Sequence, residues 1–252
     1  MYFNTHTHLN SPEQYPDRHL YIQHCLQRGI EKLCVVGYDV ESSKLAVAIA
    51  HEYPQVYAAV GISPNDCENT TEEDMKIIDK LANDDKVIGI GETGLDYYYD
   101  VPKDKQKEVF LGHIEIVKRC HKPIIIHCRD AYEETYSILE KAHIEGIMHC
   151  YSGSDQMALR FIKIGFYISL AGPVTFKNAK MPKRTAGLVP LDKLLIETDD
   201  PYLTPVPFRG KHNEPAYCIY IAKEIARLKN MDEEEIALQT YKNACKIFQL
   251  KG

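Results

Sequence analysis

The sequence predicts an α/β protein built as a single TIM-type (β/α)8 barrel with C-terminal closing helices. Three observations predict this fold. Short runs rich in Val and Ile recur about eight times, helical patterns fill most of the intervals, and 252 residues is an ordinary length for such a barrel. No internal repeat or linker interrupts the chain, so we expect one domain over residues 1–252. A doubly wound sheet is the alternative, but no Gly-rich phosphate fingerprint follows the first run.

The eight runs are nearly continuous in their hydrophobicity, as in strands buried on both faces of a parallel sheet. In chain order they are residues 2–6 (YFNTH), 32–38 (KLCVVGY), 56–62 (VYAAVGI), 87–92 (VIGIGE), 123–128 (PIIIHC), 146–151 (GIMHCY), 166–172 (FYISLAG) and 193–199 (KLLIETD). Between the fourth and fifth runs, residues 103–121 carry apolar side chains at helical spacing. The tail predicts two closing helices, in residues 214–230 and 231–250.

Composition excludes several classes of protein. Apolar residues make up 44% and charged residues 26% of the chain, which is typical of a globular protein and not of a disordered or fibrous one. The longest apolar stretches are too short to span a membrane. The N-terminus has neither a basic region nor an apolar segment typical of a signal peptide, so we expect a cytoplasmic protein.

The eight cysteines are scattered, without a C-x-x-C pair, which argues against a disulfide framework and a zinc finger. We therefore expect reduced, structural cysteines. The net charge of −6 argues against tight, general binding of nucleic acid. It does not exclude a phosphate substrate, because bound metal ions can outweigh a distant acidic surface.

Polar residues stand at the ends of several of the predicted strands. They are His6 and His8 at the end of the first, Glu92 at the end of the fourth, His127 at the end of the fifth, His149 at the end of the sixth and Asp199 at the end of the eighth. In a barrel these strand ends converge on one face, where such enzymes build their active sites. His6 and His8 also point the same way, because side chains alternate along a strand with a period of two.

Taken singly, each of these residues has a simpler explanation, as a rim histidine or as an acid that caps a helix or turn. Together they favour a metal site, because charged groups at the ends of apolar strands need pairing or coordination. The set suffices for two divalent ions, with His6, His8 and Asp199 on one, His127 and His149 on the other, and Glu92 shared. Mixed nitrogen and oxygen ligands suit Zn or Mn, with Mg as a further option. Asp199 is also the candidate general base.

An ordered set of motifs extends nearly from end to end of the chain. It comprises THTHL, IGETGLDYYY, PIIIHCRDA, GIMHCYSGS, ISLAGPVTFKNA, LLIETDDPYLTP, RGKHNEP and NACKIF. With these motifs the chain resembles the TatD-like metal-dependent deoxyribonucleases, in the amidohydrolase-type TIM-barrel superfamily. The resemblance implies that the same six residues are divalent-metal ligands and that the activity is phosphodiester hydrolysis, often exonucleolytic on DNA.

On the same resemblance, Arg129, Arg209 and Lys211 look like cations that face the phosphates of a substrate, although a surface salt bridge is the alternative for each. The basic run 177–184 (KNAKMPKR) lines the approach of a nucleic-acid strand or is a solvated loop. Tyr97, Tyr98 and Tyr99 suggest a stacking surface for an unpaired base, but we expect at least two of them to pack on the barrel. Gly91 and Gly94 flank Glu92 and allow a close backbone approach or a positive φ.

Two positions depart from the family pattern. Asn4 stands where the family usually has Asp, which removes a charge close to the histidine pair. Ser63, in GISPND, stands where family members commonly have a histidine near the substrate. Both changes leave the six candidate ligands intact, so we expect them to affect substrate preference and rate.

The leading functional hypothesis is a deoxyribonuclease that acts from a 3′ end on single-stranded or frayed DNA. A second hypothesis keeps the two metals and changes the bond, to an amide, a lactone or an aminoacyl-tRNA ester. A third is a non-catalytic barrel that serves as a scaffold, against which the full set of six ligands argues. We expect no membrane contact and no obligate protein partner.

Overall fold

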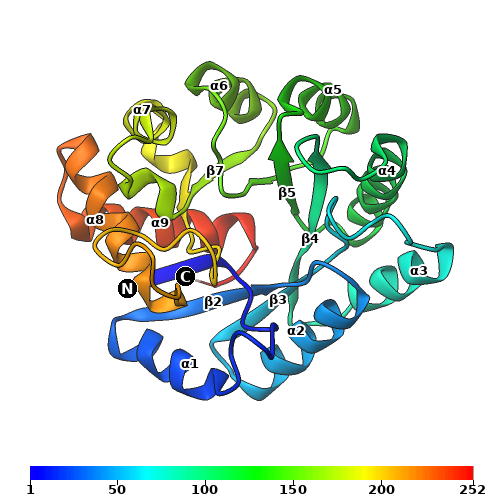
Figure 1. The fold of residues 1–252 in the computed structure, drawn as a ribbon, viewed down its shortest axis with the longest axis horizontal. Helices are drawn as coiled ribbons and strands as arrows, with labels where there is room; N and C mark the ends of the chain where they lie inside the picture. The colour runs from blue at the N-terminus through cyan, green and yellow to red at the C-terminus, as the bar shows by residue number, and fades with distance from the viewer. Residues whose placement is uncertain (252) are drawn as a thin grey trace.

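The computed structural model describes residues 1–251 and contains eight parallel strands that pair in chain order (Figure 1). The strands are β1 (Tyr2–Thr7), β2 (Ile30–Val36), β3 (Val56–Val60), β4 (Val87–Asp96), β5 (Ile124–Arg129), β6 (Gly146–Met148), β7 (Tyr167–Leu170) and β8 (Leu194–Ile196). Each predicted run overlaps one of them. The predicted TIM-type (β/α)8 barrel is confirmed.

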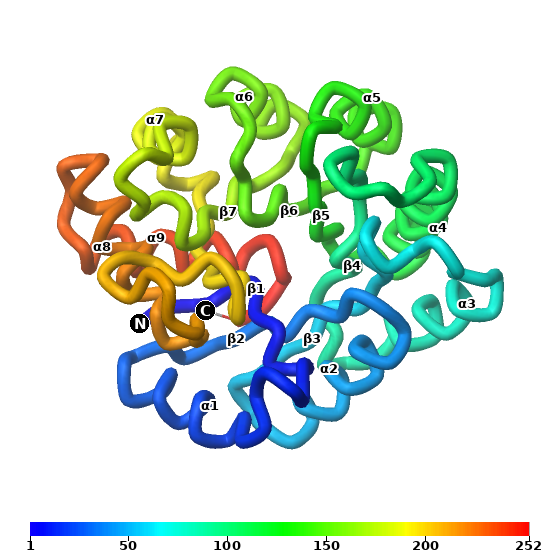
Figure 2. The backbone as a smooth tube through the Cα atoms, viewed as in Figure 1, coloured from blue at the N-terminus to red at the C-terminus, as the bar shows by residue number. Residues whose placement is uncertain are grey.

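A helix follows every strand, and the helices form a ring around the sheet (Figure 2). The α-helices are α1 (Arg18–Gln27), α2 (Val40–Glu52), α3 (Glu72–Leu81), α4 (Lys103–Cys120), α5 (Tyr132–Ala142), α6 (Asp155–Lys163), α7 (Lys180–Leu188), α8 (Cys218–Lys229) and α9 (Glu233–Ile247). Short 3-10 helices are η1 (Gly172–Thr175), η2 (Leu191–Lys193) and η3 (Pro215–Tyr217). The helix predicted over 103–121 and the two closing helices are thus present.

Local chemistry explains where helices begin and end. The side chain of Asp39 accepts a hydrogen bond from the Ser42 backbone N–H, and the Ser42 hydroxyl accepts one from the Asp39 N–H, which together cap the start of α2. Helix α4 ends where His121 adopts a left-handed conformation with φ of 57°.

Strands β1 and β8 close the barrel through the residues that follow β8. The Asp199 N–H donates to the His6 carbonyl at 3.1 Å, and the His8 N–H donates to the Asp200 carbonyl at 3.2 Å. This seam places Asp199 directly beside the two histidines of β1.

The interior of the barrel is a separate apolar core. It contains at least one buried side chain from each of the eight strands, which only a closed barrel can bring together. Helix α9 and Phe248, which directly follows it, complete this core, and the centroids of the Phe248 and Phe3 rings are 5.6 Å apart. The Asn243 side chain donates to the carbonyls of Leu191 and Leu194, at the amino end of β8. Helix α9 therefore covers the amino-terminal end of the barrel and leaves the interior of the opposite end open to a site.

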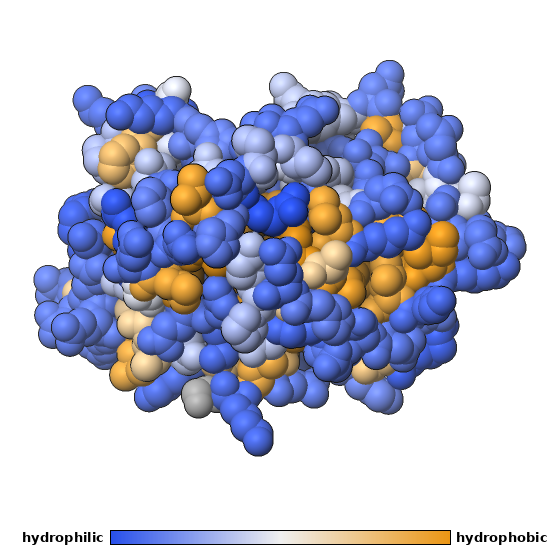
Figure 3. All heavy atoms as spheres, turned by 90° about the horizontal axis from the view of Figure 1, so that it is seen from below, coloured by the Kyte–Doolittle hydropathy of each residue, from blue (hydrophilic) through white to orange (hydrophobic). Residues whose placement is uncertain are grey.

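The outer surface is largely polar. In the view of Figure 3, hydrophilic residues cover most of the face and apolar residues appear in patches between them. None of the helices within residues 1–251 combines the length and the apolar character needed to cross a membrane.

Candidate metal centre

The six polar residues predicted at the strand ends come together at the carboxyl-terminal end of the barrel. They are His6 in β1, His8 just after it, Glu92 in β4, His127 in β5, His149 after β6 and Asp199 after β8. Their nitrogen and oxygen atoms form three overlapping groups, each compact enough to hold one cation. Residues almost 200 positions apart in the sequence therefore share one cluster.

Glu92 lies at the centre of the cluster, and its two carboxylate oxygens face different histidine pairs. Oε2 lies 3.3 Å from His6 Nε2 and 3.7 Å from His8 Nε2. Oε1 lies 3.1 Å from His127 Nδ1 and 3.6 Å from His149 Nε2. A carboxylate whose two oxygens face different histidine pairs is arranged to bridge two neighbouring cation positions.

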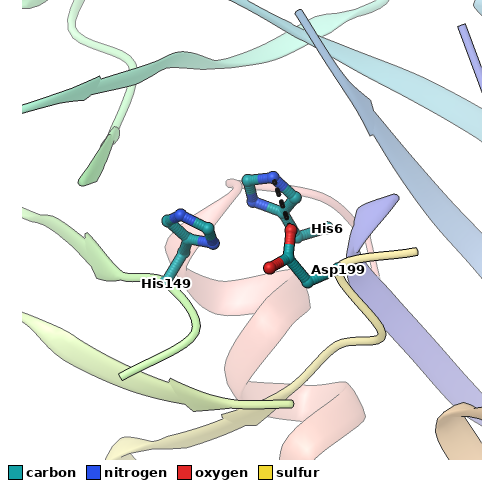
Figure 4. A group of neighbouring side chains, drawn as sticks. All are labelled: His6, His149 and Asp199. Atoms are coloured by element: carbon teal, nitrogen blue, oxygen red, sulfur yellow. Dashed lines mark ion pairs between the residues drawn. The ribbon is translucent and has the colours of Figure 1, made fainter. Parts of the chain in front are cut away.

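Asp199 completes the half of the cluster around His6 and His8. Its Oδ1 lies 3.6 Å from His8 Nε2 and 3.9 Å from His6 Nε2. Figure 4 shows this carboxylate beside His6, with His149 across from them; the His6 and His149 rings are stacked with centroids 4.1 Å apart. Asp199 reaches this place from a left-handed backbone conformation, with φ of 53°.

Hydrogen bonds on the outer side of three imidazoles determine which nitrogen faces inward. His8 Nδ1 lies 3.0 Å from the Val36 carbonyl oxygen, which can only accept, so this nitrogen carries the proton. His127 Nε2 lies 2.8 Å from Asp96 Oδ2, and His149 Nδ1 lies 3.2 Å from Glu197 Oε1. The other nitrogen of each ring faces into the cluster, where it can carry a proton or, once deprotonated, direct its lone pair at a metal.

The electrostatics of the cluster favour a positive charge inside it. Burial raises the pKa of the Glu92 carboxyl, but the charge of His149 and the hydrogen bond from His127 outweigh burial and hold this pKa well below its usual range. Burial likewise raises the pKa of Asp199, and the hydrogen bond from His8 brings it below the usual value. Both carboxylates are ionised at neutral pH, and protonated histidines balance their charge, a role that a divalent cation would take over.

The pKa values of His8, His127 and His149 are raised and show the same attraction for positive charge, whereas burial lowers the pKa of His6. Burial lowers the pKa of His8, but Asp199 and Glu92 outweigh burial and raise it to about 9. In the cluster, a divalent cation would compete with such protons for the same inward-facing nitrogens. The donor set of four imidazoles and two carboxylates therefore fits divalent metal ions.

Asp96 and Glu197 are two further residues of the candidate site that were not predicted from the sequence. Each is fully buried and holds one inward-facing histidine. Their signal in the sequence is spacing, because Asp96 follows Glu92 by four residues and Glu197 precedes Asp199 by two. We expect Glu197→Gln to weaken metal binding by roughly 10- to 100-fold, since His149 loses a charged partner but keeps its position. Calorimetric titration with metal would measure this loss, and Glu145→Gln, at an exposed position, is the matched control.

Comparison with known proteins now identifies the family. The family model described as TatD related DNase matches residues 3–249. The chain belongs to the TatD related DNase family. The predicted resemblance is confirmed, and the chain is a metal-dependent hydrolase, so the hypothesis of a non-catalytic scaffold is wrong.

Relatives of this TatD family chain cover between 91% and 99% of its length. The metal-dependent hydrolase YabD of Bacillus subtilis is 47% identical over 254 residues, which span 99% of this chain and 100% of YabD. The metal-dependent hydrolase TatD of Mycobacterium tuberculosis is 35% identical, over 91% of this chain and 90% of the relative. The crystal structure of YjjV, a TatD homologue from Escherichia coli, superposes with a TM-score of 0.94 at 26% identity, over 99% of this chain and 98% of YjjV.

Asn4, the first departure from the TatD pattern, does not face the metal centre. Its side-chain amide donates to Thr198 Oγ1 at 2.7 Å and to the Pro215 carbonyl at 3.3 Å, and its Oδ1 accepts from the backbone N–H groups of His6 and Thr198. Asn4 therefore joins β1 to the segment after β8.

We expect Asn4→Asp to lower the free energy of unfolding by about 1–3 kcal/mol, because a carboxylate oxygen would face the Pro215 carbonyl in a buried site. Urea unfolding of the two proteins measures the difference. Metal content should be unchanged, and loss of metal without loss of stability would contradict this role.

Ser63, the second departure from the TatD pattern, also forms local hydrogen bonds. It is buried, and its hydroxyl donates to Asp66 Oδ2 at 2.5 Å while it accepts from the Asn65 N–H. The serine thus holds the turn after β3, and it brings no positive charge to the site.

The three predicted substrate cations lie outside the cluster of six. Arg129 ends β5, whereas Arg209 and Lys211 are exposed in the connection between β8 and η3. None of the three forms an ion pair within the part of the chain that the structure describes. Arg209 lies 3.9 Å from the centroid of the Phe176 ring, and Lys211 Nζ lies 5.9 Å from that of Phe208.

Two local expectations were wrong. Of the two interpretations of the run 177–184, the solvated loop is wrong for part of it, because α7 begins at Lys180 and Arg184 pairs with Asp155 at 2.8 Å. Of the three tyrosines, only Tyr97 packs on the barrel, and its hydroxyl donates to Glu134 at 2.6 Å. Tyr98 and Tyr99 are 60% and 53% exposed, because the chain leaves the sheet after Asp96.

Proposed function

We propose that this chain is a two-metal phosphodiesterase that hydrolyses DNA from a 3′ end. The proposal rests on the position of Glu92, because one of its carboxylate oxygens faces His6 and His8 and the other faces His127 and His149. Such a carboxylate supports a pair of divalent ions, of which Zn, Mn and Mg suit the nitrogen and oxygen donors. The family name, TatD related DNase, supports DNA as the substrate.

In this proposal His6, His8 and Asp199 hold one ion, His127 and His149 hold the other, and Glu92 is shared. When bound, the pair of ions would act as a Lewis acid on the phosphodiester. The ions would also lower the pKa of water, so that it can attack as a nucleophile at neutral pH. Asp199 accepts the proton of the attacking water, because its carboxylate is ionised and lies at the edge of the cluster. Asp96 and Glu197 keep His127 and His149 in the required orientation.

Arg129, Arg209 and Lys211 bind the phosphate groups of the strand in this proposal. Guanidinium groups suit this role, because they can hold two phosphate oxygens through parallel hydrogen bonds. Their freedom from ion pairs within residues 1–251 supports it, since their N–H groups remain available. A phosphate-bearing substrate is therefore favoured over a simple amide or lactone.

The test uses a single-stranded oligonucleotide labelled at its 5′ end. We expect metal-loaded protein to shorten it stepwise from the 3′ end, chelation to stop the reaction, and Mn²⁺ or Zn²⁺ to restore it. Metal measured in the active protein should approach two ions per chain. Two bound ions without cleavage of any nucleic acid would overturn the proposal and favour another ester, such as an aminoacyl-tRNA.

A further inference from the structure

Two large aromatic side chains are exposed beside the metal centre. Tyr98 and Tyr99 follow β4 and are 60% and 53% exposed. Their rings meet edge to face, with centroids 5.0 Å apart and planes at 90°. Neither hydroxyl forms a hydrogen bond with another described residue. Neither burial nor hydrogen bonding of the side chains therefore explains why two tyrosines stand at these positions.

A guanidinium without an acidic partner lies over the first of these rings. The central carbon of Arg129 is 3.6 Å from the centroid of Tyr98 and 5.5 Å from that of Tyr99. The outer helices contain a comparable pair, in which Arg160 lies 4.1 Å from the centroid of Tyr136. There, however, Glu133 accepts two hydrogen bonds from the guanidinium, at 2.6 and 2.8 Å. In residues 1–251 Arg129 has no such carboxylate, and its N–H groups are available to a phosphate.

The backbone connects these tyrosines to the metal centre. Asp96 Oδ1 accepts hydrogen bonds from the N–H groups of Tyr98 at 2.9 Å and Tyr99 at 3.4 Å. Its other oxygen, Oδ2, holds His127 at 2.8 Å. Arg129 follows His127 by two residues on β5 and is paired in register with Asp96. One carboxylate thus fixes both a candidate metal ligand and the start of the tyrosine pair.

We infer that Tyr98, Tyr99 and Arg129 form a stacking site for an unpaired nucleobase next to the phosphodiester that is cleaved. The inference rests on the proposed phosphodiesterase function and specifies its substrate as a single strand. A base within a duplex is covered on both faces by its neighbours, whereas an unpaired terminal base can lie on an aromatic ring. Arg129 holds the adjacent phosphate, and stacking accepts any base because every base has a π-face.

Binding is tested with metal-loaded protein and an oligonucleotide that has phosphorothioate linkages and 2-aminopurine at its 3′ end. We expect quenched fluorescence on binding to the wild-type protein, because the base stacks on tyrosine. Tyr98→Leu/Tyr99→Leu should bind roughly 5- to 150-fold more weakly and without the quench, which is the range for loss of a base–aromatic stack. Tyr98→Phe/Tyr99→Phe should restore both, and Tyr136→Leu should match the wild type.

Cleavage provides the second test, with an oligonucleotide that lacks the bases of its last two residues. For the wild-type protein we expect the abasic strand to have a KM raised by a similar factor. For the leucine double variant, the two strands should have the same KM. A double variant that still quenches 2-aminopurine and still discriminates against the abasic strand overturns the inference.

The two proposals fail in different ways. A wild-type protein that quenches the base and cleaves no strand overturns the phosphodiesterase and leaves the stacking site in place. A wild-type protein that cleaves DNA and treats normal and abasic strands alike overturns the stacking site alone.

Discussion

Replacing Glu92 with glutamine is expected to reduce kcat/KM by roughly 10³-fold or more. The amide keeps the size of the side chain but removes the charge that both histidine pairs face. A loss of about 4 kcal/mol of transition-state stabilisation corresponds to this factor and is within the range that metal activation supplies. Steady-state kinetics on a single-stranded oligonucleotide measure the rate, and metal analysis should give fewer than two ions per chain.

A matched control separates this effect from a general loss of acidic charge. Glu115→Gln changes an exposed acid on α4, whose partner is Lys118, and should retain wild-type turnover. Near-normal activity of Glu92→Gln at full metal content would show that Glu92 does not bridge the two ions.

Replacing Gly94 with alanine is expected to lower the free energy of unfolding by about 3–5 kcal/mol and to reduce activity strongly. Gly94 has φ of 142°, which side chains rarely adopt, and an added Cβ would lie 2.0 Å from the His127 carbonyl oxygen. The strained backbone and the forced separation of β4 from β5 each contribute to the loss. Because His127 is the residue displaced, metal affinity should fall together with stability. Urea unfolding and metal titration measure the two effects.

Gly187 provides a control of opposite sign. It lies within α7, and an added Cβ would meet no atom within 4 Å. Gly187→Ala should therefore raise stability by about 0.5–1 kcal/mol and leave metal binding unchanged. If Gly94→Ala and Gly187→Ala lowered the free energy of unfolding equally, the close approach of β4 to β5 at Gly94 would not be the cause of the loss.

The fold and the position of the six clustered residues were predictable, because the signal is local. An apolar run such as PIIIHC defines a strand and ends on its own polar residue, so strand and candidate ligand are read together. The parallel arrangement then brings the ends of all the strands to one face, whatever the distance between them in the sequence. The position of these residues on one face therefore follows without knowledge of any contact between distant segments.

Other features depend on contacts between distant segments. Nothing in the sequence indicates that Glu197 pairs with His149, 48 residues away, because the two belong to different strands. The same holds for α9, whose patterning predicts a helix but not its place across the end of the barrel. Helix α7 was missed for a local reason, since it contains Pro182 and Gly187, which are poor helix formers. Proline is tolerated there because it lies in the first turn.

The position of α9 has a consequence for the order of events during synthesis. The chain emerges from its amino end, so Phe3 and the other inward-facing residues of the barrel are made long before Phe248, which covers them. Until α9 is made, the amino-terminal end of the barrel is open to water, and its apolar side chains are available to chaperones and proteases. The clustered residues are spread over much of this interval, from His6 in the first strand to Asp199 after the last. A chain that stalls between Asp199 and α9 therefore carries all six candidate ligands but lacks the helix that completes the barrel core.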